Sequence, residues 1–243
     1  MVPFNNFLWR TSMDLAQTYH TYQGEVMRIL KRTNAVITGD HFVYAQKPDG
    51  WYHGRDYVNK DAIYPWVGNT SKLCDVIASQ FADEQIETVV GPAIGGVILS
   101  QWVTHHLINN LFNSTGKTMQ IYAIFADDVD NKRVIKRGYG AYVKDKQCLI
   151  VEDVINSGLT VANTRDAILQ AGGIVVGVGA LCNRSGGKVT AQTLAVPKLF
   201  SLMNVSMEMF KEEDCPICKE RGVESVRTDL GKGKEFLARI GKV

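Results

Sequence analysis

The sequence lacks the features that mark several large classes of protein. Its formal net charge is only +2 over 243 residues, which is too small to favour nucleic acid or an anionic membrane surface as a partner. No apolar run is long enough to span a bilayer, and residues 1–10 lack the basic segment and long apolar core of a secretory signal. Internal repeats, low-complexity stretches and linkers between independent domains are also missing. We therefore expect a cytoplasmic protein that binds neither nucleic acid nor a membrane.

Cysteine is scarce, and the number of cysteines is odd. Of the five, Cys74, Cys148 and Cys182 fall in apolar patterns, which favours reduced thiols over a disulfide framework. Cys215 and Cys218 have the spacing of half a metal site, but tetrahedral zinc needs four ligands. No second cysteine pair stands nearby, and the five histidines are scattered without a recognisable second half. We expect free thiols on a surface loop, with structural zinc as the less favoured alternative.

What the sequence does contain is an alternation of apolar runs and helical patterns between about residues 66 and 203. With 45% hydrophobic and 21% charged residues, the chain can bury the core of one domain. We expect helices over 69–81, 97–111 and 161–171, and strands over 87–90, 120–126, 147–151, 174–181 and 199–203. Strands that alternate with helices predict an α/β fold with a parallel sheet and helices on both faces.

The two ends of the chain do not follow this rhythm. Residues 11–32 have the spacing of an amphipathic helix, and 41–45 and 53–59 read as short strands around a strong turn signal at 47–50. We expect about residues 1–65 to form, together with the C-terminal extension from about 204 to 243, a small cap over the carboxyl edge of the sheet. Within the core, Asn69 or Thr70 is the expected N-cap of a helix. Residues 127–137 read as a polar loop, and 139–143 as an extended segment.

The most informative stretch runs from Cys148 to Thr160. Four apolar residues lead into Glu152 and Asp153, and a short loop of small and hydroxyl-bearing residues then opens a helix. Ligands of open α/β sheets bind just past the carboxyl ends of the strands, and a helix start suits a phosphate. The acids would repel that phosphate, so they are better placed to bind sugar hydroxyls or a cation. A phosphate beside a diol describes a ribose 5-phosphate; the alternative is an ordinary strand-loop-helix with both acids solvated.

Residues 151–160, Val-Glu-Asp-Val-Ile-Asn-Ser-Gly-Leu-Thr, resemble the phosphoribosyl pyrophosphate (PRPP) signature of type I phosphoribosyltransferases. The loop from Val90 to Gly96 is similar to that of the orotate enzymes in this family. The resemblance implies one domain over residues 1–243, with a central parallel sheet flanked by helices and a small N-terminal hood. It implies transfer of the phosphoribosyl group of PRPP to orotate, giving orotidine 5′-monophosphate and pyrophosphate. It also implies Mg²⁺, bound mainly through PRPP, and a homodimer.

The same resemblance implies roles for individual residues. Glu152 and Asp153 would hold the ribose hydroxyls, Asn156, Ser157, Gly158, Leu159 and Thr160 the 5-phosphate, and Gly95 and Gly96 the pyrophosphate. A basic loop would neutralise the departing pyrophosphate through Arg133, Arg137 and a catalytic lysine, either Lys136 or Lys132. Orotate would be contacted by Arg184, by Lys60 and by the backbone of Asn156. Lys60 could also face a phosphate. Gly95 stands where many relatives have a lysine, and Leu159 where they have a small or hydroxyl residue.

Two other functions fit the same residues. One is a phosphoribosyltransferase that uses a purine or another base. The other is a non-catalytic regulator that keeps the PRPP site as a sensor. Such a regulator needs a nucleic-acid-binding element, and the sequence shows neither a strongly basic face nor room for a winged-helix domain before the core.

Overall fold

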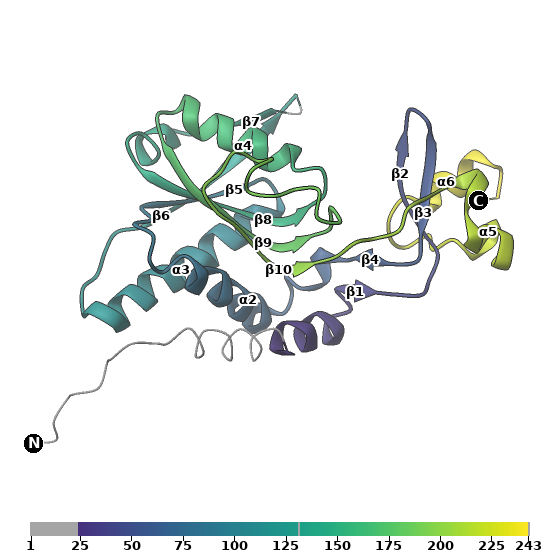
Figure 1. The fold of residues 1–243 in the computed structure, drawn as a ribbon, viewed down its shortest axis with the longest axis horizontal. Helices are drawn as coiled ribbons and strands as arrows, with labels where there is room; N and C mark the ends of the chain where they lie inside the picture. The colour runs from purple at the N-terminus through teal and green to yellow at the C-terminus, as the bar shows by residue number, and fades with distance from the viewer. Residues whose placement is uncertain (1–23, 131, 243) are drawn as a thin grey trace, which may run out of the picture.

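The computed structural model describes residues 24–130 and 132–242 (Figure 1). At its centre is a six-stranded sheet with the order β10-β9-β8-β5-β6-β7. Every neighbouring pair is parallel except β6 with β7, which is antiparallel. The strands are β5 (Thr88–Pro92), β6 (Tyr122–Val129), β7 (Lys132–Val134), β8 (Gln147–Ile155), β9 (Ile174–Asn183) and β10 (Leu199–Asn204). The predicted parallel α/β sheet is therefore confirmed.

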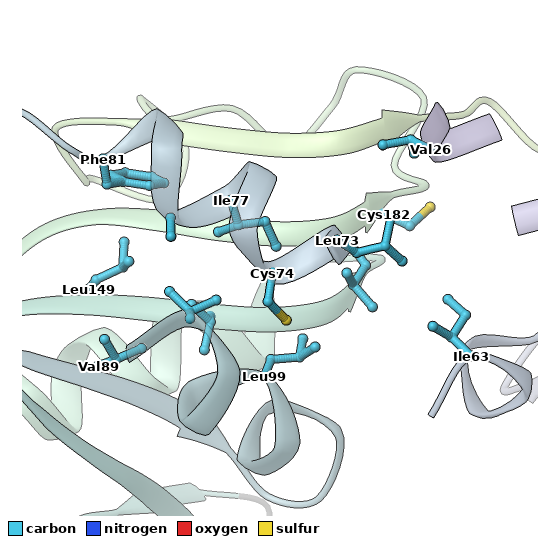
Figure 2. Packing of buried hydrophobic residues seen from close by; sticks show 14 of the residues in the cluster. Val26, Ile63, Leu73, Cys74, Ile77, Phe81, Val89, Leu99, Leu149 and Cys182 are labelled. Carbon is cyan, nitrogen blue, oxygen red and sulfur yellow. The ribbon is translucent and has the colours of Figure 1, made fainter. Parts of the chain in front are cut away.

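Helices cover both faces of this sheet (Figure 1). α2 (Val67–Gln80) and α3 (Gly95–Thr115) pack on one face, and α4 (Leu159–Gln170) packs on the other. Successive residues of a strand point to opposite faces, so Leu149 of β8 belongs to the cluster under α2 and α3, whereas Ile150 belongs to the cluster under α4. Figure 2 shows the first of these clusters, with Leu73, Cys74 and Ile77 of α2 and Phe81 directly after it near Val89, Leu99 and Leu149.

Two glycines of β9 let α2 lie close to the sheet. A β-carbon on Gly177 would stand 2.6 Å from the ring of Phe81, and one on Gly179 would stand 2.5 Å from Ile77. Real β-carbons do not approach other atoms so closely, so side chains at these two positions would push the helix away. The absence of side chains here fixes the depth at which α2 packs.

A hairpin near residue 50 and the C-terminal segment of the described chain meet in a small unit beside the main sheet (Figure 1). β2 (Phe42–Lys47) and β3 (Gly50–Gly54) form a hairpin, and β11 (Phe210–Lys211) pairs with β3 from the far end of the sequence. We call this unit, residues 41–54 and 210–242, the terminal module. Its short helices are η3 (Glu212–Asp214), α5 (Pro216–Arg221), η4 (Val223–Ser225) and α6 (Gly233–Arg239). Its apolar cluster consists of Val43, Trp51, Val226, Phe236 and Leu237.

A second small sheet joins the terminal module to the core. β1 (Val36–Ile37) pairs antiparallel with β4 (Tyr57–Val58), and η1 (Lys60–Ala62) follows. Residues 24–32 are helical, and the remainder of the helix expected over 11–32 lies outside the described residues. The division into hood, core and extension within one domain stays a prediction. No helix in residues 24–130 or 132–242 combines the length and the apolar character needed to cross a bilayer.

Several local expectations were wrong, and one of them is the strand over 53–59, which is divided between the end of β3 and β4. The segment 127–137 is a β-hairpin rather than a loop, because β6 continues to Val129 and pairs with β7. Residues 139–143 are not extended: η2 (Tyr139–Tyr142) is a 3-10 helix whose first ring packs edge-on against Phe125 at 5.4 Å. The N-cap of α2 is Trp66 rather than Asn69 or Thr70, because Thr70 lies inside the first turn and donates its hydroxyl proton to the carbonyl of Ile63.

Candidate functional site

The two acids of the signature lie near the carboxyl end of β8, not beyond it. The strand was expected to end at residue 151 but continues to Ile155, so Glu152 and Asp153 are strand residues. Their exposed fractions are only 5% and 6%. Adjacent strand residues point to opposite faces of the sheet, so the two carboxyl groups have different neighbours. The prediction of two solvated acids is thereby excluded.

Asp153 is held by side chains from η1 and from the segment between η1 and α2, and it lies against the start of α3. The ammonium of Lys60 lies 2.6 Å from Asp153 Oδ2, and the hydroxyl of Tyr64 lies 3.3 Å from the same oxygen. A β-carbon on Gly95 would stand 1.6 Å from that oxygen and 3.2 Å from the Lys60 nitrogen. A side chain at position 95 would therefore displace this arrangement. The carboxylate of Asp153 fills the space that a side chain at Gly95 would enter.

The charges in this cluster depend on one another. Burial alone would lower the pKa of Lys60, but the hydrogen bond and charge of Asp153 outweigh it and raise that pKa. Lys60 therefore stays positively charged at neutral pH. Burial, and next the charge of Asp153, raises the pKa of Glu152 well above its ordinary value. Burial also raises the pKa of Tyr64, which keeps its hydroxyl protonated and able to donate a hydrogen bond.

The loop after β8 has the shape that a phosphate requires. Gly158 is the N-cap of α4 at a φ of 81°, and a β-carbon there would stand 3.0 Å from Leu194 and 3.2 Å from Val189. Gly158 has no side chain to cap the helix, and the N–H of Leu159 makes only a long hydrogen bond of 3.4 Å to the Ser157 hydroxyl, so the N–H groups of the first turn face the loop without an intrahelical acceptor. Asn156, Ser157 and Leu159 are exposed, and Leu159 is 62% exposed. The leucine therefore projects into solvent and leaves the backbone of the loop accessible.

The glycine loop before α3 is tightly closed. Gly95 and Gly96 form the first turn of α3, whereas the sequence predicted a helix start at residue 97. A β-carbon on Gly91 would stand 1.9 Å from the carbonyl oxygen of Gly96. Only glycine fits at position 91, and the backbone N–H groups at the start of α3 lie beside the cluster around Asp153.

The four cations of the β6–β7 hairpin fall into two groups. Arg137 donates two hydrogen bonds to Asp127, at 3.2 and 3.1 Å, and Arg133 forms an ion pair of 2.9 Å with Asp128. Lys132 and Lys136 are exposed. The arginines are therefore tied to the aspartates of their own hairpin, whereas the two lysines form no ion pair within the described residues.

Arg184 stands beside the phosphate loop. It directly follows β9, and its backbone N–H donates to the carbonyl of Ile155 at 2.9 Å, which places it next to Asn156. Its guanidinium lies over the ring of Tyr44 from the terminal module, 5.7 Å from the ring centre. Tyr44 and Tyr64 are site residues that the sequence interpretation missed. No motif marks Tyr44, because its relation to Arg184 exists only in the folded chain.

Cys215 and Cys218 do not lie on a free surface loop. Both belong to the terminal module, where their sulfur atoms lie close to ring nitrogens of His41 and His53. The expectation that no histidine completes the pair is wrong for these two residues. The hairpin of β2 and β3 brings them to the cysteines, and no sequence spacing shows this.

Comparison with known proteins agrees with the fold and the signature. The model of the phosphoribosyl transferase domain matches residues 68–200, from α2 to the start of β10. The chain therefore belongs to the phosphoribosyltransferase family. Its matches within the family include the orotate phosphoribosyltransferase of Chlorobium phaeobacteroides (strain BS1), which is 31% identical over 195 residues, 80% of this chain and 90% of the relative.

Solved structures share the architecture. The orotate phosphoribosyltransferase of Mycobacterium tuberculosis H37Rv, in complex with inorganic phosphate, aligns with a TM-score of 0.54 at 14% identity, covering 76% of this chain and 96% of that one. The adenine phosphoribosyltransferase of Rhodothermus marinus aligns with a TM-score of 0.51 at 17% identity, covering 75% of this chain and 99% of that one. Enzymes for different bases thus share this fold, and the fold does not select the base.

Proposed function

We propose that this phosphoribosyltransferase transfers the phosphoribosyl group of PRPP to orotate, giving orotidine 5′-monophosphate and pyrophosphate. The observation that carries the proposal is the placement of the Asp153 carboxylate and the open head of α4 at the same end of β8. A ribose 5-phosphate has its anion at one end and its diol at the other, and this edge offers a partner for each. The curated relatives at about 30% identity are named for orotate, which favours that base.

Asn156, Ser157, Gly158, Leu159 and Thr160 would bind the 5-phosphate through backbone N–H groups and hydroxyls. Asp153, with Glu152, would accept hydrogen bonds from the ribose hydroxyls. In the structure Lys60 forms an ion pair with Asp153 Oδ2, an oxygen that would otherwise be available to the ribose. The side chain of Lys60 is 35% exposed and belongs to a short 3-10 helix. Lys60 would turn from Asp153 to the pyrophosphate when PRPP binds, which frees the carboxylate for the sugar.

Charge separation is the main demand of the reaction. As the bond between C1 and pyrophosphate breaks, positive charge develops on the ribose ring and negative charge on the leaving group, so catalysis depends on positioning and electrostatic stabilisation. Gly95 and Gly96 would donate backbone N–H groups to the pyrophosphate. Lys136 or Lys132, the exposed lysines of the hairpin, would add positive charge, with Arg133 and Arg137 beside them. Arg184 would meet the carboxylate of orotate with its planar guanidinium, next to the backbone of Asn156.

The residues at this edge fit Mg²⁺ only when it is bound together with PRPP. Asp153 supplies the hard oxygen donor that Mg²⁺ prefers, but within the described residues no cluster of three acidic, histidine or cysteine ligands lies here. The cation would therefore be held largely by the oxygens of PRPP. When bound, it would offset negative charge on the pyrophosphate. A homodimer and a cytosolic location stay predictions.

The test offers orotate, adenine and hypoxanthine separately, with PRPP and Mg²⁺, and follows both the loss of base and the release of pyrophosphate. Turnover with orotate alone supports the proposal. Turnover with a purine but not with orotate would replace it by a purine phosphoribosyltransferase on the same scaffold. No pyrophosphate release with any base would favour the non-catalytic PRPP sensor.

A further inference from the structure

Four metal-ligand side chains converge in the terminal module, away from the residues assigned to catalysis. They are His41 at the start of β2, His53 on β3, and Cys215 and Cys218 at the start of α5. One ligand atom from each lies within 4.8 Å of all the others. His41, His53 and Cys215 are fully buried. Cys218 follows His53 by 165 residues, so the cluster joins the two ends of the chain.

We propose that His41 Nε2, His53 Nδ1, Cys215 Sγ and Cys218 Sγ bind one zinc ion in a closed, structural Cys₂His₂ site. Tetrahedral zinc has Zn–S distances of about 2.3 Å and Zn–N distances of about 2.0–2.1 Å. These lengths place two nitrogens about 3.3 Å apart, and a nitrogen and a sulfur about 3.6 Å apart. The two ring nitrogens are 3.1 Å apart, and the nitrogen–sulfur distances are 3.7, 3.6 and 3.4 Å.

Hydrogen bonding sets the tautomer of His41. Ser225 lies 2.7 Å from His41 Nδ1, and its hydroxyl donates to the carbonyl of Gly222 at 2.7 Å. The hydroxyl has only one proton, so its oxygen accepts the Nδ1–H of His41. The Nε2 lone pair of His41 therefore points at the cluster. A metal-bound histidine is commonly oriented in this way through its other ring nitrogen.

Hydrogen bonds within the cluster do not account for all four groups. Nε2 of His41 has one lone pair, which His53 Nδ1 and both sulfur atoms approach together. A single hydrogen bond from His53 would use that lone pair and leave the two thiols without it as an acceptor. One cation at the centre satisfies all four donor atoms. Two thiolates and two imidazoles in a tetrahedron select zinc among common single ions, and a full set of protein ligands marks a structural site.

The terminal module is small, so a bound ion would help to stabilise its fold. Among the described residues, five buried apolar side chains form its cluster, and Phe42 and Ile217 are buried as well, which is a small core for a unit assembled from two distant segments of the chain. A metal that ties β2 and β3 to α5 replaces apolar burial that the module lacks.

The first experiment measures metal in the purified full chain. Mass spectrometry of elements should find about one zinc per chain. Replacement by Co²⁺ should give the visible absorption of a tetrahedral ion, together with thiolate-to-cobalt charge transfer. Protein that takes up no zinc when it is supplied, or a cobalt spectrum without thiolate charge transfer, would overturn the proposal. Neither reading depends on which base the enzyme uses.

Variants locate the ion. Cys218→Ser and His53→Gln should each lose zinc, whereas the controls Cys74→Ala and His105→Gln should keep it, because those residues lie on α2 and α3. Zinc retained by Cys218→Ser at the level of the unaltered chain would refute the assignment. If a variant fails to fold, titration of the unaltered chain with a mercurial decides: zinc should leave as thiols react, and zinc that stays after all thiols have reacted contradicts the site.

Discussion

The sheet edge at the carboxyl end of β8 and the terminal module both bury polar groups, but with opposite effects on stability. At the edge, Glu152 and Asp153 are consecutive residues of a buried strand, where burial opposes ionisation of Glu152 and the charge of Asp153 opposes it further. In the module, His41, His53, Cys215 and Cys218 converge on one point with complementary donor geometry. At the edge, the proposed substrate would have to form hydrogen bonds with the buried carboxyl groups. In the module, four side chains are placed to coordinate one cation. Under the two proposals made above, burial of polar groups serves substrate binding in one region and assembly of the fold in the other.

The strongest test of the edge is Asp153→Asn. The amide keeps the shape but loses the charge that pairs with Lys60 and would bind the ribose hydroxyls. We expect kcat/KM to fall roughly 10²–10³-fold, as for the loss of one preorganised electrostatic group. Steady-state kinetics and circular dichroism measure activity and fold, and Asp83→Asn on the surface is the matched control. Unchanged activity in Asp153→Asn would remove the acids from the mechanism.

The strongest test of the module is the double change Cys215→Ser and Cys218→Ser. We expect amide hydrogen exchange in β2, β3 and α6 to accelerate roughly 100-fold, because the small core there cannot hold the hairpin alone. Exchange in β8 and β9 should change little. Equal acceleration in both regions would show that the module and the sheet unfold as one unit, and the contrast between them would fail.

Arg184 tests the contact between the two regions. Arg184→Ala should raise the KM for orotate roughly 10-fold, the scale of one charge-assisted pair, and the KM for PRPP much less. Tyr44→Leu removes the ring under the guanidinium and should move the KM for orotate in the same direction by a smaller factor. Equal changes in the KM values of both substrates would count against a base-binding role.

The smallest expected effect concerns Glu152 and pH. Burial, and next the charge of Asp153, raises its pKa in the folded chain above the ordinary 4.5. The folded chain therefore binds the proton more tightly, and this stabilisation is present below that ordinary pKa and lost as pH rises through the folded pKa. Glu152→Gln cannot ionise, so above the folded pKa it should exceed the unaltered chain in unfolding free energy by about 1 kcal/mol.

Urea unfolding at a series of pH values measures this difference, which should vanish at acidic pH. The exposed Glu213→Gln is the control and should follow the unaltered chain throughout. A variant less stable than the unaltered chain at neutral pH would mean that the Glu152 carboxylate stabilises the fold.

The parts of the fold that depend on apolar pattern could be predicted from the sequence. The runs in β8 and β9 are buried on both faces, so composition alone indicates parallel strands. The end of β8 could not be found in this way, because Glu152 and Asp153 look like loop residues until Lys60 and the glycine turn around Gly95 are known. The hairpin at 127–137 was missed for a similar reason: its cross-strand pair of Asp128 and Arg133 reads as loop composition.

The candidate site divides in the same way. The signature from Glu152 to Thr160 is continuous, so its chemistry can be predicted from consecutive residues. The cluster of the terminal module is discontinuous, since a hairpin and a segment near the far end supply its members. Cys215 and Cys218 supply two of the four ligands that a tetrahedral metal site needs. Only the folded structure identifies which of the five histidines lie beside them.

The packing of Arg184 on Tyr44 has an evolutionary consequence. An arginine that immediately follows β9 rests on a ring supplied by a separate unit, so substitutions in that unit alter the setting of the guanidinium without touching the PRPP signature. With Arg184 in its proposed role at the base, selectivity for the acceptor and chemistry at the sugar could then diverge independently. A family with this construction can acquire a new acceptor by exchanging one appendage while its reaction stays the same.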